Sequence, residues 1–99
     1  MLNIDKTIAE DSQIRLSGRL DTTTAPELET VVDEVLENGQ SLTLDMEELE
    51  YISSAGLRVI LKAQKGMSRK GGMKLVHVPE AVMEVFTITG FSDFLTIEG

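Results

Sequence analysis

The chain has 99 residues, which is enough for one domain with its own hydrophobic core and too few for two. Hydrophobic residues make up 41% of the sequence and charged residues 26%, a composition typical of globular proteins rather than disordered or fibrous ones. The formal net charge of -8 argues against nucleic acid and anionic membrane surfaces as partners, because both attract Lys and Arg. We therefore expect protein partners.

Cysteine is absent from the sequence, which excludes disulfides, thiolate chemistry and the usual structural zinc sites. Residues 1–10 carry acids and lack a basic leader, so they do not resemble a signal peptide, and no segment approaches the ~20 apolar residues of a membrane span. These features predict a cytoplasmic protein, and no pattern in the sequence calls for a cofactor.

The first third of the chain predicts a β-hairpin followed by a helix. Residues 2–7 and 14–18 alternate apolar and polar side chains on either side of a polar stretch, as hairpin strands do. Thr24 and Glu27 have the spacing of a capping box, so we expect the helix to begin there. Apolar residues then recur at helical spacing until Asn38-Gly39, which we expect to end the helix in a left-handed conformation.

The middle of the chain predicts a short strand over 41–45, a polar turn over 47–50 and a second helix from Ala55 to about Lys70. On that helix, apolar side chains extend beyond the main stripe beside several charges. Two interpretations are open: a wider buried stripe, which is favoured, or an exposed contact patch. The residues concerned are Val59, Ala63 and Met67.

The last third predicts a strand over 73–78, a helix that opens after Pro79 and closes at Gly90, and a final strand over 94–97. The whole order is ββαβαβαβ, and strands that alternate with helices imply right-handed crossovers and a largely parallel sheet. The predicted class is α/β, with residues 1–99 as a single domain.

Ligands and partners of open α/β sheets meet the carboxyl ends of the strands, where loops enter helices. Residues 18–24 and 51–57 both lead from a strand into a helix at that edge. Either Ser53 or Ser54 can cap the second helix. Gly56, a poor helix former, leaves room either for an approaching partner or phosphate, or for tight packing of the helix on the sheet.

Three segments together resemble the STAS domain of bacterial anti-sigma factor antagonists. They are Gly18-Arg19-Leu20-Asp21, Asp45 at a strand end, and Ser53-Ser54-Ala55-Gly56-Leu57. The element order, length and acidity of the whole chain also fit that family. The resemblance implies a regulator that binds an anti-sigma factor of the serine-kinase type when unphosphorylated, releases it on phosphorylation, and is restored by a serine phosphatase.

Alignment of the Gly-Leu pair with the family's Asp-Ser-Ser/Thr-Gly-Leu turn implies Ser54 as the phosphorylated residue, ahead of Ser53. Two departures accompany it: Ser53 stands in place of the usual aspartate, and Ala55 in place of the second hydroxyl residue. Asp21 matches the acidic residue of the first loop, or is simply a turn residue. The implied partner-binding residues are Asp21, Thr22, Ser53, Ser54, Ala55, Gly56, Leu57 and Arg58.

Two other classes of function are weighed against this switch. STAS-like domains also serve as constitutive scaffolds or transporter-associated subunits without phosphorylation, and the two departures favour that alternative. An enzyme is less well supported, because the sequence has no P-loop, no GxGxxG, no serine-histidine motif and no set of histidines at metal-binding spacing. The single histidine, His77, falls within a predicted strand. We therefore expect no catalytic residues and no metal.

Overall fold

The computed structural model describes residues 1–98, which form five strands, three α-helices and one 3-10 turn. In chain order they are β1 (Leu2–Thr7), β2 (Asp11–Leu20), α1 (Ala25–Asn38), β3 (Ser41–Ile52), α2 (Ser54–Met67), β4 (Met73–Val76), α3 (Glu80–Thr89), η1 (Phe91–Asp93) and β5 (Ile97–Glu98).

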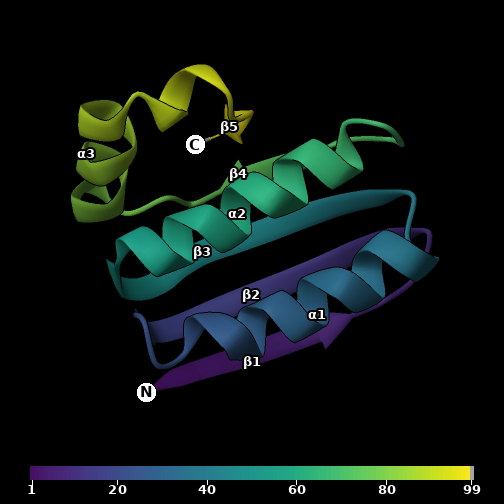
Figure 1. Cartoon of the computed structure of the whole chain (residues 1–99), viewed down its shortest axis with the longest axis horizontal. Helices are drawn as coiled ribbons and strands as arrows, with labels where there is room; N and C mark the ends of the chain where they lie inside the picture. The colour runs from purple at the N-terminus through teal and green to yellow at the C-terminus, as the bar shows by residue number, and fades with distance from the viewer. Residues whose placement is uncertain (99) are drawn as a thin grey trace.

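The strands form one sheet in the order β1-β2-β3-β4-β5 (Figure 1). Strand β1 is antiparallel to β2, and every later pair is parallel. Helices α1 and α2 lie side by side against one face of the sheet (Figure 1). The predicted α/β class, the N-terminal hairpin and the mostly parallel sheet are confirmed.

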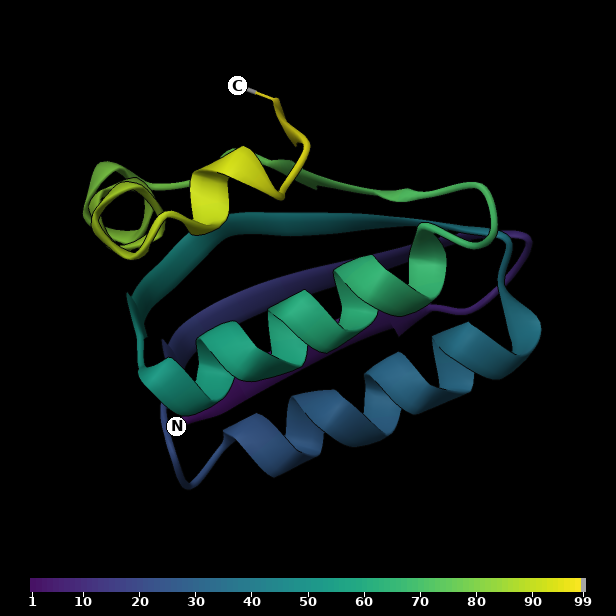
Figure 2. The ribbon, with the colours of Figure 1, turned by 45° about the horizontal axis from the view of Figure 1, so that its top comes forward.

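The core lies between the sheet and helices α1 and α2. Alternate side chains of β3, Leu42, Leu44 and Met46, are buried on that side, whereas Thr43 and Asp45 point to the opposite, open face. In Figure 2, α1 and α2 run along one side of the sheet, and α3, seen end-on, packs against the bent end of β3. No helix among residues 1–98 is long and apolar enough to span a membrane.

The prediction of a polar turn over 47–50 is wrong, because β3 continues through this segment as one strand of 12 residues. Its pairing with β2 slips twice, each time with one extra residue on β3, as in a β-bulge. Buried positions therefore change from a spacing of two, up to Met46, to a spacing of three, at Leu49 and Ile52. Two bulges, rather than a turn, explain why acidic residues interrupt the alternation.

Helix α1 begins where the sequence predicted, but both of its predicted caps are wrong. Thr24 has helical backbone angles, and its side chain makes no capping hydrogen bond. Gly39 has φ -99° and ψ 158°, which is extended rather than left-handed. A Cβ at Gly39 would lie 2.8 Å from Ser12 Oγ, so the glycine is needed for close approach. At the helix end, the Gly39 N–H donates to the carbonyl of Val35, and the Lys70 ammonium donates to the carbonyls of Leu36 and Gly39.

Helix α2 ends at Met67, earlier than the predicted Lys70, and residues 68–71 form a turn. The wider buried stripe on this helix is confirmed, because Val59, Ala63 and Met67 are 7%, 1% and 0% exposed. The alternative of an exposed apolar patch on this helix is therefore discarded.

The C-terminal region differs from the prediction in the extent of its strands. Strand β4 stops at Val76, because His77 has a positive φ of 54° and turns the chain out of the sheet. Gly90 closes α3 in the left-handed conformation, as expected. The final strand is limited to Ile97–Glu98, and Phe94, expected in a strand, follows a 3-10 turn and is 66% exposed.

Candidate functional site

The two segments singled out in the sequence meet at one edge of the sheet. Leu20 and Ile52 are Cα partners at the ends of β2 and β3, and the N–H of Ser53 donates to the carbonyl oxygen of Leu20 at 2.8 Å. The loop that carries Asp21 therefore lies against the start of α2. The expectation that the two segments lie side by side is confirmed.

Asp21 organises its own loop through hydrogen bonds to the next residues. Its Oδ1 accepts from the N–H groups of Thr23 and Thr24, each at 3.0 Å. The Thr24 hydroxyl accepts from the Asp21 N–H at 2.8 Å and donates to the carbonyl of Arg19 at 2.9 Å. The Thr24 N–H holds the pKa of Asp21 below its ordinary value, helped by the Thr24 hydroxyl and the Thr23 N–H. Asp21 is therefore an ionised anchor of the loop as well as an acidic group at its surface.

The two serines at the start of α2 have different roles. Ser53 has extended backbone angles and is the N-cap, with its Oγ accepting from the N–H of Gly56 at 3.3 Å. Ser54 is the first helical residue and is exposed. Among residues 1–98, no partner contacts its hydroxyl within hydrogen-bond distance. The sequence left open which of the two serines caps α2, and the structure shows that it is Ser53.

Gly56 brings α2 close to the sheet. A Cβ at this position would lie 2.6 Å from Cγ of Leu20 and 3.1 Å from Cγ1 of Ile52. Tight packing of helix against sheet, one of the two explanations open in the sequence, therefore accounts for the glycine. It also fixes the start of α2 directly over the ends of β2 and β3.

A shallow groove of about 360 Å³ runs between α1 and α2, and it is lined at the start of α2 by Ala55, the residue after Ser54. Three of the predicted partner-binding residues, Thr22, Ala55 and Arg58, line it. Gly56 and Leu57 are buried, so these two support the site from beneath and do not offer a surface to a partner. The remaining groove residues are Ala25, Pro26, Glu29, Val59 and Lys62.

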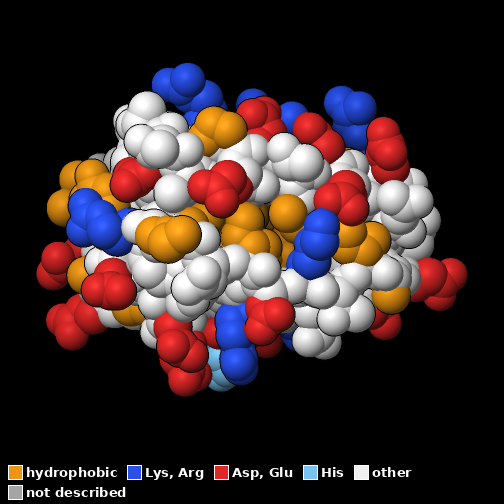
Figure 3. Space-filling model, turned by 90° about the horizontal axis from the view of Figure 1, so that it is seen from below, with side chains coloured by type: hydrophobic (Ala, Val, Ile, Leu, Met, Phe, Trp, Pro, Cys, Tyr) orange, Lys and Arg blue, Asp and Glu red, His pale blue; other side chains and the backbone are white. Residues whose placement is uncertain are grey.

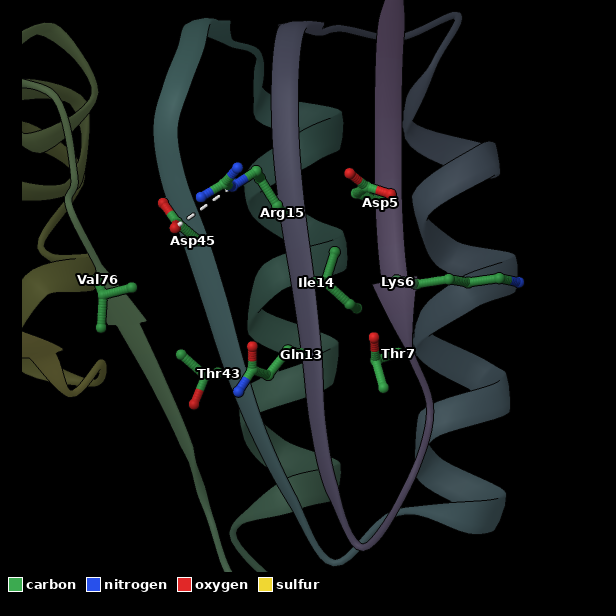
Figure 4. Close-up of a pocket in the computed structure, with 9 residues that line it drawn as sticks. All are labelled: Asp5, Lys6, Thr7, Gln13, Ile14, Arg15, Thr43, Asp45 and Val76. Carbon is green, nitrogen blue, oxygen red and sulfur yellow. Dashed lines mark ion pairs between the residues drawn. The ribbon is translucent and has the colours of Figure 1, made fainter.

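A second cluster, on the open face of the sheet, was not predicted as a site. His77 Nδ1 lies 3.3 Å from Asp45 Oδ1 and 3.7 Å from Glu47 Oε2. Arg15 Nε lies 3.7 Å from the other Asp45 oxygen, an ion pair that Figure 4 marks with a dashed line. Both residues line a hollow of about 420 Å³. In the surface view of Figure 3, the histidine is visible at the lower rim, between acidic side chains and a basic one.

Electrostatics keep Asp45 ionised in this cluster. Partial burial raises the pKa of Asp45. Three interactions together lower it by more: the hydrogen bond from the N–H of Glu47, the contact with His77 and the charge of Arg15. The net shift is therefore downward. The three ligand atoms of Asp45, Glu47 and His77 lie within 4.8 Å of one another, close enough to share a cation. The hydrogen bond between His77 and Asp45 and the ion pair of Asp45 with Arg15 account for the arrangement without one.

The register of the sheet explains why sequence reasoning missed this cluster. Asp45 is paired with Val76, the last residue of β4, so His77 follows directly beside it. The available signal was that Asp45 and His77 both lie near the ends of predicted neighbouring strands. Glu47 joins them only because β3 continues through the segment expected to be a turn.

The STAS domain family matches residues 3–99 of this chain. The anti-sigma-B factor antagonist of Bacillus subtilis is 31% identical over 98 residues, a match that covers 97% of this chain and 90% of the relative. The protein of the same name in Staphylococcus aureus is 26% identical over 99 residues and covers 97% and 92%.

Solved structures share the fold. An anti-sigma factor antagonist from Mycobacterium paratuberculosis superposes with a TM-score of 0.88 at 21% identity, covering 98% of this chain and 85% of that chain. The antagonist SpoIIAA in its unphosphorylated form gives 0.81 at 18% identity, with 100% and 89% covered. The phosphorylated form of Bacillus SpoIIAA gives 0.74 at 17% identity, with 100% and 92% covered.

Proposed function

Because this chain belongs to the STAS domain family, we propose that it acts as an anti-sigma factor antagonist controlled by phosphorylation at Ser54. In its unmodified form it binds an anti-sigma factor of the serine-kinase type and so frees a sigma factor. Phosphorylation ends that binding, and a serine phosphatase restores it. In this proposal the chain is the substrate of the kinase and performs no catalysis, and the exchange takes place in the cytoplasm.

The observation that carries the proposal is the exposed Ser54 hydroxyl at the first position of α2. A kinase needs a hydroxyl that is accessible and not committed to the fold. Ser53 fulfils the structural need for a cap, which leaves Ser54 available. Ser53 stands where the family has an aspartate, and like aspartate it can accept a hydrogen bond from an N–H of the helix.

The start of α2 can accept a phosphate without rebuilding the fold. The first turn of a helix has unpaired N–H groups and a partial positive charge, and a neighbouring anion is stabilised there by roughly 0.3 to 1 kcal/mol. A phosphate of about −1.5 to −2 charges at Ser54 therefore remains compatible with the helix. The phosphate therefore weakens the binding of the partner rather than the stability of the fold.

The names of the relatives support the general kind of partner. The Bacillus subtilis and Staphylococcus aureus relatives are antagonists of an anti-sigma factor, and SpoIIAA has been solved in phosphorylated and unphosphorylated forms. The same edge of this chain presents Asp21, Thr22, Ser53, Ser54, Ala55 and Arg58, which we propose as the partner surface, with Gly56 and Leu57 as its buried support.

The experiment incubates the purified chain with its cognate anti-sigma kinase and ATP, and maps the phosphate by mass spectrometry of peptides. We expect one phosphate on Ser54. Ser54→Ala should remain unmodified, whereas the matched variant Ser53→Ala should still be phosphorylated. A phosphate on another residue, or a chain that stays unmodified while a known antagonist is phosphorylated in parallel, would refute the proposal. Co-purification with a membrane transporter would favour the constitutive scaffold instead.

A further inference from the structure

Helix α2 concentrates positive charge in an acidic protein. It carries Arg58, Lys62 and Lys65 and no acidic residue, while the chain as a whole has a formal net charge of -8. Spacings of four and three residues place these side chains on one face of the helix. All three line a shallow hollow on the outer side of α2, and Arg58 and Lys62 also line the groove between α1 and α2.

Only part of this charge is free. Lys62 Nζ lies 2.8 Å from Asp33 Oδ1 and 3.0 Å from Glu29 Oε2, both on α1, and the hydrogen bonds that Lys62 donates to these carboxylates raise its pKa. The ion pairs found between residues 1–98 include neither Arg58 nor Lys65. Arg58 is therefore the first free cation along α2 after Ser54.

We propose that, once Ser54 is phosphorylated, the Arg58 guanidinium of the same molecule binds the phosphate. Phosphorylation would then have two effects. It would add negative charge at the start of α2, and it would neutralise the free positive charge of Arg58 in the groove. This inference rests on the proposed phosphorylation of Ser54 and names the residue through which that modification acts.

The positions of the two residues on the helix suit this contact. Arg58 follows Ser54 by one helical turn, which puts their Cβ atoms about 5 to 6 Å apart. An anion four residues before a cation is the favourable orientation on a helix. The planar guanidinium can donate two parallel N–H bonds to phosphate oxygens, which a lysine ammonium cannot do in the same geometry.

Neighbouring carboxylates do not already occupy Arg58. Asp21 Oδ1, at the same edge of the sheet, accepts the N–H groups of its own loop, and Glu29, in the same groove, pairs with Lys62. In the unmodified chain Arg58 thus remains available to an acidic side chain of a partner. In the phosphorylated chain, the acidic side chain of the partner would instead face the negative phosphate, and Arg58 would already be paired with that phosphate.

The test installs phosphoserine at position 54 during translation, so that no kinase is required, and follows the phosphate by ³¹P NMR across a pH titration. A nearby cation favours the dianion and lowers the second pKa of a phosphate. We expect Arg58→Gln to raise that pKa by about 0.2 to 0.4 unit relative to the unsubstituted phosphoprotein. The matched control Lys65→Gln, which removes a free cation about three helical turns from Ser54, should change that pKa much less.

Identical titration curves with and without Arg58 would overturn the inference, as would an equal shift in Lys65→Gln, which would indicate a general charge effect. Circular dichroism of each variant checks that α2 remains folded. The proposed function is judged separately by the kinase assay. A phosphate that senses Arg58 in a chain that its kinase does not modify would uphold the contact and refute the proposed function.

Discussion

The N–H of Ser53 donates a hydrogen bond to the carbonyl oxygen of Leu20 at 2.8 Å, and this bond joins the two halves of the candidate site. Leu20 precedes the acidic loop, and Ser53 precedes the serine that we propose as the phosphate acceptor. The hydrogen bond fixes the start of α2, and with it Ser54, relative to the sheet and the acidic loop. A small chemical change at this edge can alter binding without a change of fold.

Charge at position 54 should control partner affinity. We expect Ser54→Asp to weaken binding to the unphosphorylated form's partner by about a hundredfold, equivalent to about 2.7 kcal/mol, because a carboxylate would then face the interface. Ser54→Ala should retain affinity, since it adds no charge. Isothermal titration calorimetry measures both. Equal affinities would show that charge at this position does not control binding.

The cap of α2 should be assigned to Ser53 by stability measurements. Ser53→Ala removes the acceptor of the Gly56 N–H and should lower the free energy of unfolding by about 1 kcal/mol. Ser54→Ala removes an exposed hydroxyl that makes no hydrogen bond within residues 1–98, and it should change the free energy of unfolding little. Urea denaturation of both variants provides the comparison, and a larger loss in Ser54→Ala would reverse the two roles.

The close packing of α2 on the sheet makes Gly56 sensitive to a single methyl group. In Gly56→Ala the new Cβ meets the fully buried Leu20, which should cost about 1 to 3 kcal/mol. After the gain in helix propensity of about 1 kcal/mol, the free energy of unfolding should fall by up to about 2 kcal/mol. The matched control is Gly66→Ala, whose Cβ meets the terminal methyl of the half-buried Leu36, which can rotate away. If both variants lose the same stability in urea denaturation, close packing at Leu20 is not the cause.

Acid should destabilise the fold partly through Asp45. The pKa of Asp45 is lower in the folded chain than its ordinary value, so its contribution to stability is present above the unfolded-state pKa and is lost as pH falls through the folded-state pKa. Asp45→Asn should therefore be less stable at neutral pH and should lose less stability between pH 5 and about pH 2. Thermal melts across this range test it, and parallel curves for both proteins would contradict it.

Lys70 should stabilise the end of α1 through its charge and its donors. Lys70→Met keeps most of the aliphatic chain but removes the hydrogen bonds to the carbonyls of Leu36 and Gly39. We expect a loss of about 1 to 2 kcal/mol in the free energy of unfolding. Lys65→Met, which removes an exposed lysine without an ion pair among the described residues, is the control for urea denaturation. Equal effects would indicate that Lys70 contributes only by packing.

The sequence by itself determined the order of the elements, the α/β class and the position of the candidate site. These depend on periodicity, because the spacing of apolar residues specifies which face of each strand or helix is buried. The serine and glycine turn at 53–57 was also visible, since residues that start a helix are neighbours in the chain. The family resemblance built on those residues is confirmed by the match over residues 3–99.

Only the tertiary structure decided which atoms satisfy which partners. It assigned the cap to Ser53, made Thr24 a member of the Asp21 loop instead of a helix cap, and ended α1 with the side chain of Lys70. It also paired Asp45 with Val76, which placed His77 beside Asp45, and it carried β3 through two bulges, which added Glu47. The physical reason is that hydrogen bonds and ion pairs between distant segments depend on strand register, and register is set by the packing of the whole sheet.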